Sequence, residues 1–437
     1  MAYGWVGGLA YNMRRFERLQ IYVQLRVHVF SQGNPMPKPA ISASASNDAT
    51  APMRMPATHA PWAEDLGTEA WAELELPSIE ALPQERVDVA VIGAGVAGLS
   101  AALAAAQAGA RVVVLEAGQT IGQGATGRNA GILSAGINMG LADAPPGEDG
   151  ADMWPATTRE LLALVDEAKK PGAILSASLT GALSLAESPT AARGLAREAR
   201  ARVALGLRAE LWTPARVSEA TGGRLNTQGV EAALWLPDEG RIQPLTLLAH
   251  LAQQARAAGV IFAGGAFVRS HETRRLSGTT CWTLAIDENT TITARALIVA
   301  TGPTAQPTAR IYALALPAAL PATFPLFWDA APYTYMDFRP GTGYLTASGG
   351  RYAPPGGSSR DRIYHQRLAD AARRWLPELA GRKPSHAWAV DLAVAHDMIP
   401  RLRPLSSDAP GVVIEGLGAL GVLPGIVLGK RAGAATA

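Results

Sequence analysis

Residues 86–118 contain the strongest fold signal in the chain and read "RVDVAVIGAGVAGLSAALAAAQAGARVVVLEAG". The short β-branched run Val87–Ile92 predicts a buried parallel strand. An Ala- and Leu-rich stretch follows, which predicts a helix that ends at Gly109. A second apolar strand, Arg111–Leu115, is followed at once by Glu116. Strand, glycine turn, helix and strand in this order predict a Rossmann-type βαβ unit.

The glycines of this unit indicate a dinucleotide site. Gly93, Gly95 and Gly98 fit G-x-G-x-x-G, in which the first permits the tight turn, the second lets a pyrophosphate approach the backbone, and the third allows close helix packing. The start of the helix attracts the diphosphate. Glu116, 23 residues beyond Gly93, is placed to accept hydrogen bonds from a ribose diol. The predicted site for the ADP half also includes Val96, Ala97 and Ala117. An ordinary glycine-rich turn is the alternative for the triplet alone.

The next segment, "GQTIGQGATGRNAGILSAG", bears on the choice between FAD and NAD. NAD dehydrogenases usually continue with regular βα repeats, whereas this segment predicts a glycine-rich loop that leads into a helix. A loop of that kind favours a flavin, since a second segment must reach the ribityl chain and the ring. We expect Arg128 and Asn129 to donate hydrogen bonds to the diphosphate or the ring. A surface loop with a solvated arginine is the alternative.

These motifs together resemble the D-amino acid oxidase superfamily of FAD-dependent amine oxidoreductases. The loop is similar to the branch that contains gamma-glutamylputrescine oxidase, with glycine oxidase and sarcosine oxidase further off. The resemblance runs from about residue 62 to the end of the chain and implies bound FAD. It places the loop residues Thr126, Gly127, Arg128, Asn129, Ala130 and Gly131 at the cofactor. Cys281 lies in an expected strand away from these loops, so we expect FAD to be bound non-covalently.

The resemblance also implies a two-domain α/β fold. A discontinuous Rossmann-type FAD-binding domain is expected at 84–150, 238–308 and 388–437, and a substrate domain built on a mixed β-sheet at 151–237 and 309–387. We expect a helix in residues 157–170 that opens with a capping box, Thr157 with Glu160, and another capped by Ser188.

Later segments supply further cofactor contacts by resemblance. Val268 is placed at the adenine, and Thr301 and Gly302 close to the dinucleotide. A glycine loop and helix near the end are expected at the flavin N1–C2=O edge through Gly416, Gly418, Gly421 and Val422.

Two departures from the family pattern concern the C-terminal segment. The chain has Ala419-Leu420-Gly421 where the family commonly has Gly-His-Gly, and it stops soon after Lys430. Both motivate the alternative of a catalytically degenerate flavin-binding protein.

The segment "FPLFWDAAPYTYMDFRPGTGY" is expected to cover the flavin and bind the substrate through Tyr335, Asp337 and Arg339. Many family members carry an arginine here that holds a substrate carboxylate. Asp337 in that place would repel a carboxylate and favour a cationic amine. In the alternative, Asp337 is a solvated edge residue and Arg339 is the substrate partner. The residues alone leave both open.

The resemblance implies oxidation of the C–N bond of a small amine or amino acid to an imine, with oxygen or a quinone as electron acceptor. FAD carries the difficult step, so no acid–base triad is required and no catalytic side chain is assigned. An NAD-dependent dehydrogenase is the remaining alternative.

The composition bears on which other classes of protein the chain could belong to. Lys plus Arg number 39 against 37 acids, a net charge of +2, which offers no electrostatic case for nucleic acid. The single cysteine excludes a disulfide framework and favours a reducing compartment, so we expect a cytoplasmic protein. No apolar run is long enough for a membrane span, and the seven histidines show no metal-ligand spacing.

The first 63 residues differ from the rest, because they hold two acids, Glu17 and Asp48, against six Lys or Arg. They are a targeting peptide or an upstream extension of the reading frame. Under either interpretation we expect residues 1–63 to be largely disordered, as a low-complexity stretch rich in Pro, Ser and Ala.

Overall fold

The computed structural model describes residues 60–437 except 277, 304–306, 331–335 and the side chain of Arg351. Most of the expected N-terminal extension therefore lies outside the described residues. Residues 60–63 do not fit that expectation, because they form a 3-10 turn, η1 (Pro61–Ala63), in which Trp62 is only 1% exposed. The chain joins the core earlier than the sequence predicted, since one buried tryptophan outweighs the polar composition around it.

A mixed sheet, eight-stranded within the described residues, contains the expected βαβ unit. Strand β1 (Val87–Ile92) lies between β12 (Thr291–Val299) and β2 (Val112–Leu115), and all three are parallel. Helix α3 (Val96–Gln107) connects β1 to β2. The other strands are β9 (Ile261–Ala263), β10 (Ser270–Leu276), β11 (Thr279–Ala285), β18 (Arg401–Pro404) and β19 (Gly411–Glu415). This arrangement confirms the Rossmann-type unit.

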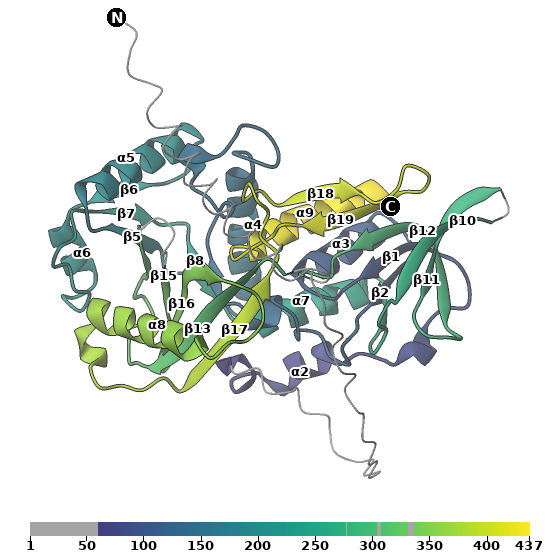
Figure 1. Cartoon of the computed structure of the whole chain (residues 1–437), viewed down its shortest axis with the longest axis horizontal. Helices are drawn as coiled ribbons and strands as arrows, with labels where there is room; N and C mark the ends of the chain where they lie inside the picture. The colour runs from purple at the N-terminus through teal and green to yellow at the C-terminus, as the bar shows by residue number, and fades with distance from the viewer. Residues whose placement is uncertain (1–59, 277, 304–306, 331–335) are drawn as a thin grey trace, which may run out of the picture. The chain divides into compact units, whose positions relative to one another are not determined.

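Helices α3 and α9 (Val422–Thr436) lie side by side against this sheet (Figure 1). A Cβ added at Gly429 would lie 2.4 Å from the Ala97 carbonyl oxygen, and one added at Gly433 would lie 2.3 Å from the Ala101 carbonyl oxygen. The two backbones therefore approach as closely as glycine permits. Because the contacts run in the same direction along both helices, the two helix N-termini lie at the same end.

A second sheet has the order β17-β13-β16-β15-β14-β5-β7-β6. It is mixed, since β14 and β5 are parallel while its other described pairs are antiparallel. A mixed second sheet confirms the expected fold class. In sequence order the strands are β5 (Ala182–Ala186), β6 (Glu210–Trp212), β7 (Ala232–Leu236), β13 (Ala309–Pro317), β14 (Leu326–Asp329), β15 (Met336–Pro340), β16 (Tyr344–Ala353) and β17 (His386–Leu392).

The remaining elements surround these sheets. A small sheet of order β3-β8-β4 joins the segment after the glycine-rich loop to the chain near residue 240. Its strands are β3 (Ile132–Leu133), β4 (Ala177–Leu179) and β8 (Gly240–Ile242). The other helices are α2 (Thr68–Leu74), α4 (Met153–Ala168), α5 (Pro189–Ala204), α6 (Pro214–Ala220), α7 (Pro244–Ala257) and α8 (Asp361–Trp375). The domain boundaries stay a prediction.

Two local expectations are wrong. The glycine-rich loop leads through a 3-10 turn, η3 (Thr126–Arg128), into the short strand β3 and not into a helix, because Gly131 and Gly136 adopt positive φ. Thr157 does not cap a helix, since α4 begins at Met153 and the Thr157 hydroxyl lies buried inside it. Burial of Met153 and Trp154 extends the helix upstream of the Thr157–Glu160 pattern. The Ser188 cap is confirmed, with its hydroxyl 3.2 Å from the Ala191 N–H.

Candidate functional site

A cavity of about 600 Å³ lies where β1, β2, β12 and β19 end and where α3 and α9 begin. Its volume is in the range of small-molecule and cofactor pockets. Most of the predicted site residues line it: Gly93, Gly95, Val96, Ala97, Glu116, Thr126, Arg128, Asn129, Ala130, Thr301, Gly302, Asp337, Gly416, Gly418, Gly421 and Val422. Segments far apart in the sequence thus meet in one cavity.

Other predicted residues lie outside the lining: Gly98, Ala117, Gly127, Gly131, Val268 and Arg339. A Cβ added at Gly98 would lie 1.9 Å from the Gly93 carbonyl oxygen, and one added at Gly127 would lie 2.0 Å from the Gly122 carbonyl oxygen. Gly98 and Gly127 therefore serve tight turns. Val268 packs instead against the apolar cluster on the Rossmann-type sheet. Tyr335 lies outside the described residues.

The glycine turn after β1 opens onto the cavity. Gly93 has φ +100°, a conformation that glycine adopts readily, and an added Cβ there would lie 2.7 Å from the Ala300 carbonyl oxygen. At Gly95 no described protein atom comes closer than 3.4 Å to an added Cβ. The protein alone therefore does not require glycine at 95. A ligand that approaches the backbone at this point would require it.

Glu116 is oriented by two backbone groups. Its Oε2 accepts a hydrogen bond from the Ala94 N–H at 2.8 Å, and its Oε1 accepts one from the Gly118 N–H at 3.0 Å. The carboxylate is therefore fixed at the cavity wall beside the glycine turn. This is the place at which a ribose diol bound to such a unit is recognised.

Three side chains from distant parts of the chain hold the loop Arg128–Gly131. The indole N–H of Trp388 donates to the Arg128 carbonyl at 2.7 Å, and that of Trp62 donates to the Asn129 carbonyl at 2.9 Å. Arg339 Nε donates to the Gly131 carbonyl at 2.9 Å. No sequence pattern predicted that either tryptophan holds this loop. A tryptophan shortly before the first strand was the one available signal.

Asn129 holds the same loop from within. Its Nδ2 donates to the Thr126 carbonyl at 2.5 Å, and its Oδ1 accepts from the Gly131 N–H at 2.6 Å. Both amide atoms of Asn129 are thus used to shape the turn. An asparagine between glycines stabilises such turns because its side chain replaces backbone partners.

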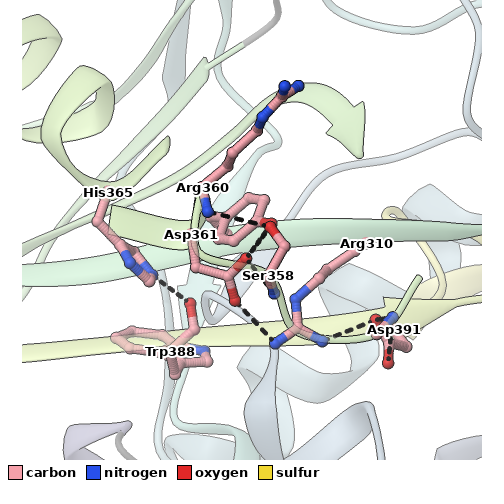
Figure 2. Close-up of polar contacts among 9 residues, drawn as sticks. Arg310, Ser358, Arg360, Asp361, His365, Trp388 and Asp391 are labelled. Atoms are coloured by element: carbon pink, nitrogen blue, oxygen red, sulfur yellow. Dashed lines mark hydrogen bonds and ion pairs between the residues drawn. The ribbon is translucent and has the colours of Figure 1, made fainter. Parts of the chain in front are cut away.

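Arg128 lines the cavity close to a group of charged residues on and beside β17. Burial lowers the pKa of Arg128, and the nearby Asp391 carboxylate opposes that shift. Figure 2 shows Arg310 between Asp391 and Asp361, at 2.9 and 3.3 Å. It also shows His365, whose Nε2 lies 2.9 Å from the Trp388 carbonyl oxygen. These contacts hold β17 and therefore the Trp388 ring that supports the loop.

Arg339 serves the loop and not the cavity. Its side chain is 6% exposed, and its Nη2 donates to the Ile242 carbonyl at 2.9 Å in addition to the bond with Gly131. The guanidinium lies 4.9 Å from the centre of the Trp62 ring. Burial lowers the pKa of Arg339 to about 10, with the nearby Tyr344 hydroxyl opposing the shift.

Asp337 is the substrate-side candidate that lines the cavity. It lies on β15 opposite Ser348 of β16, which also lines the cavity. Burial and the negative charge of Asp337 together raise the pKa of Tyr352 to about 12, while the Ala419 backbone opposes that shift. Asp337 thus lies near the loop before α9. Of the two alternatives, the geometry places Asp337 and not Arg339 at the cavity.

Apolar side chains that were not predicted form part of the remaining wall, beside polar and charged ones such as Arg403 and Glu415. The apolar side chains come from the small sheet, from the second large sheet, from the loop before α9 and from the first turn of α9: Ile132, Ile311, Val390, Leu392, Leu417, Leu420 and Leu423. No contiguous motif identifies them, because they are ordinary core-type residues that the fold gathers around a cavity.

The residues present fit a flavin dinucleotide. Two helix N-termini suit a diphosphate, Gly95 leaves room beside one of them, Glu116 is oriented for a ribose, and an apolar wall suits a flat ring. Within the described residues, no three His, Cys, Asp or Glu side chains are grouped to hold a metal ion. Among the same residues, no helix is both long and apolar enough to cross a membrane.

Known proteins place this geometry in a family. Residues 88–435 match the model of the DAO family, described as FAD dependent oxidoreductase. A probable oxidoreductase, OrdL, from Haemophilus influenzae is 42% identical over 85 residues, which span 19% of this chain and 20% of that relative. The match to this curated relative thus covers about a fifth of its length.

Solved structures share the fold. Glycine oxidase from Geobacillus kaustophilus is similar with a TM-score of 0.66 and 21% identity over 80% of this chain and 93% of that one. L-proline dehydrogenase from P. horikoshii has a TM-score of 0.66 and 16% identity over 80% of this chain and 93% of that one. Iminodiacetate oxidase from Chelativorans sp. BNC1 has a TM-score of 0.62 and 20% identity over 78% of this chain and 93% of that one.

The family match extends over most of the chain and includes both glycine loops that line the cavity. It confirms the expected superfamily and the expected cofactor, FAD, and it is inconsistent with the nicotinamide alternative. The chain belongs to the FAD-dependent oxidoreductase family.

Proposed function

We propose that this protein oxidises the C–N bond of a small amine or amino acid to an imine. The observation that carries the proposal is one cavity that joins the dinucleotide-type turn at Gly95, the apolar wall and the Asp337 carboxylate. The chemistry that FAD supplies when bound is acceptance of a hydride from the carbon next to the nitrogen.

The cofactor is proposed to contact the glycine turn, Glu116, the loop at Arg128 and the loop before α9. The two helix N-termini favour negative charge on the diphosphate and on the ring. The bonds from Trp62, Trp388 and Arg339 keep the Arg128–Gly131 loop in one conformation before the cofactor binds. Cys281 is buried in β11 and is the only cysteine of the chain, which supports non-covalent binding.

The substrate is proposed to lie between the apolar wall and Asp337. A carboxylate in a partly desolvated cavity attracts an ammonium group and repels a substrate carboxylate. This supports an amine, or a substrate with a second cationic group, over a simple amino acid. The apolar side chains exclude water from the reacting carbon, and no side chain is proposed to move a proton.

The electron acceptor is proposed to be oxygen or a quinone. Proteins of this fold include ones named oxidases and ones named dehydrogenases. A cytoplasmic location stays a prediction from the single cysteine.

Anaerobic addition of an amine and amino acid panel to the purified protein tests the function. The protein should be yellow, should release FAD on denaturation, and should lose its flavin absorbance with at least one amine. Bound FAD that no member of the panel bleaches would favour a flavoprotein without turnover, as the Ala419-Leu420 departure suggests. A protein that releases FMN or no flavin would contradict the cofactor site.

A further inference from the structure

The segment 135–142 is held at three points by side chains, two of them buried (Glu239 and Thr157) and one partly buried (Glu198). The Ala135 N–H donates to Glu239 at 2.8 Å, and the Ala142 N–H donates to Glu198 at 2.9 Å. Arg202 pairs with both carboxylates, at 3.2 and 2.8 Å. The Gly136 N–H donates to the Thr157 hydroxyl at 2.8 Å. A segment bonded in this way is a rigid support, because removing one partner leaves a buried polar group unsatisfied.

Asn138 lies in the middle of this segment and bonds to the loop before α9. Its Nδ2 donates to the Leu417 carbonyl at 3.0 Å, and its Oδ1 accepts from the Leu420 N–H at 3.1 Å. Gly418, one of the two residues between Leu417 and Leu420, has φ +62°, and an added Cβ there would lie 2.6 Å from the Asn138 amide. The side chain and the loop backbone are therefore in direct contact, and only glycine fits between them.

The loop that Asn138 holds ends in the first turn of α9. Leu417, Gly418, Leu420, Val422 and Leu423 all line the cavity. The first N–H groups of a helix have no partner within the helix and carry partial positive charge. The body of α9 is held against α3 by its glycines, so the part of the helix whose position depends on the preceding turn is its first turn, which begins at Gly421 and carries these N–H groups.

We propose that Asn138 is a positioning residue for the flavin. It fixes the turn at Leu417–Leu420 so that the positive N-terminus of α9 faces the ring and favours the reduced, more negatively charged form. The inference rests on the proposed placement of the flavin beside α9. It concerns the reduction potential, which does not depend on which amine is the substrate.

The midpoint potential of the FAD-loaded protein, measured by equilibration with a reference dye, tests the inference. Asn138→Ala should lower the preference for reduced over oxidised FAD about tenfold, which for a two-electron couple is a potential about 30 mV more negative. Asn226→Ala is the matched control. Asn226 also donates to one carbonyl, that of Arg374 at 3.1 Å, and accepts from one N–H, that of Gln228 at 3.0 Å, but it does not line the cavity. Its potential should equal that of the wild type.

Gly418→Ala approaches the same contact from the loop. Its Cβ would displace the Asn138 amide and should also make the potential more negative. In the Asn138→Ala background the displaced atoms are gone, so the same substitution should shift the potential less. If Asn138→Ala does not retain FAD, the Gly418→Ala variant tests the inference alone, through whether its midpoint potential is more negative than that of the wild type.

Two results would overturn the inference: an Asn138→Ala potential equal to that of the control, or, in the variants that retain FAD, a Gly418→Ala shift that is absent or equal in both backgrounds. The amine panel addresses the proposed function separately. A wild type that no amine reduces, together with the expected shift on dye titration, would reject the proposed function and leave the role of Asn138 intact.

Discussion

At the scale of single residues, the orientation of Glu116 by two backbone N–H groups makes its carboxylate a ready hydrogen-bond acceptor. Glu116→Ala should lose charge-assisted hydrogen bonds to the ribose, worth about 1–3 kcal/mol, and weaken FAD binding roughly 5- to 150-fold. Titration of the apoprotein with FAD, followed by flavin fluorescence, measures the change. Glu116→Gln keeps one acceptor oxygen and should lose less. Equal affinity in Glu116→Ala and wild type would contradict the assignment.

Asp337 should decide between amines and amino acids. Asp337→Asn should raise the activation free energy for a diamine by about 2 kcal/mol, because it removes one charge from a partly desolvated cavity. This lowers kcat/KM for the diamine roughly thirtyfold. It should change kcat/KM for an amine with a neutral tail much less, and Asp337→Arg should shift the preference toward amino acids.

The control for Asp337 is Asp238→Asn, which removes a carboxylate paired with Arg208 away from the cavity lining. The measurement is the ratio of kcat/KM for a diamine and an amino acid in each variant. A ratio that stays constant across the Asp337 variants would show that this carboxylate does not contact the substrate.

Tyr352 predicts sensitivity to alkali. Burial and the charge of Asp337 raise its pKa from 10.0 to about 12 in the folded protein. Between these values the folded state keeps a proton that the unfolded state has lost, so stability falls as the pH rises from 10 toward 12. The urea midpoint at pH 11 should therefore fall relative to pH 9 by less in Tyr352→Phe than in the wild type. An equal fall in both would show that Tyr352 titrates normally.

At the scale of elements, the crossing of α3 and α9 depends on two glycines. Gly429→Ala or Gly433→Ala would bring a Cβ within 2.4 Å of a backbone carbonyl oxygen, which cannot move as a side chain can. Each should lower the free energy of unfolding by about 1–3 kcal/mol and weaken FAD binding, since both helix N-termini lie at the cavity.

Gly194→Ala in α5 is the matched control for this crossing. An added Cβ there meets no atom within 4 Å, so the substitution should be neutral or stabilise by about 0.4–1 kcal/mol. Urea unfolding of the three variants compares them. Comparable stability in all three would mean that α3 and α9 are further apart than the structure indicates.

At the scale of the whole molecule, Trp62 joins the first described residues to the core. Deleting residues 1–58 should leave folding, flavin content and activity unchanged, as the composition of that stretch predicts. Deleting residues 1–66 should lower flavin content, because it removes the indole that donates to the Asn129 carbonyl and packs under Arg339. Flavin absorbance per protein in the two deletions provides the measurement. Full flavin content in the longer deletion would show that Trp62 is dispensable.

Local sequence patterns predict the parts of this protein that depend on neighbouring residues. The unit from β1 to Glu116, the stop at Gly109 and the Ser188 cap all follow from patterns a few residues long, and each is present in the structure. The flavin assignment followed from two such patterns and their resemblance to one family.

The contacts between distant residues follow from three-dimensional packing and not from local patterns. Trp62, Arg339 and Asn138 bond to partners 67, 208 and 279 residues away. Asp337 and Arg339 are two positions apart on β15 and therefore share one face of the strand, so no local pattern encodes which of them reaches the cavity. Thr157 was misassigned for the same reason, because burial of its neighbours in a core shared with distant segments overrides a local capping pattern. Adjacent residues determine local backbone geometry, whereas the support of the cavity depends on packing between segments that are far apart in the sequence.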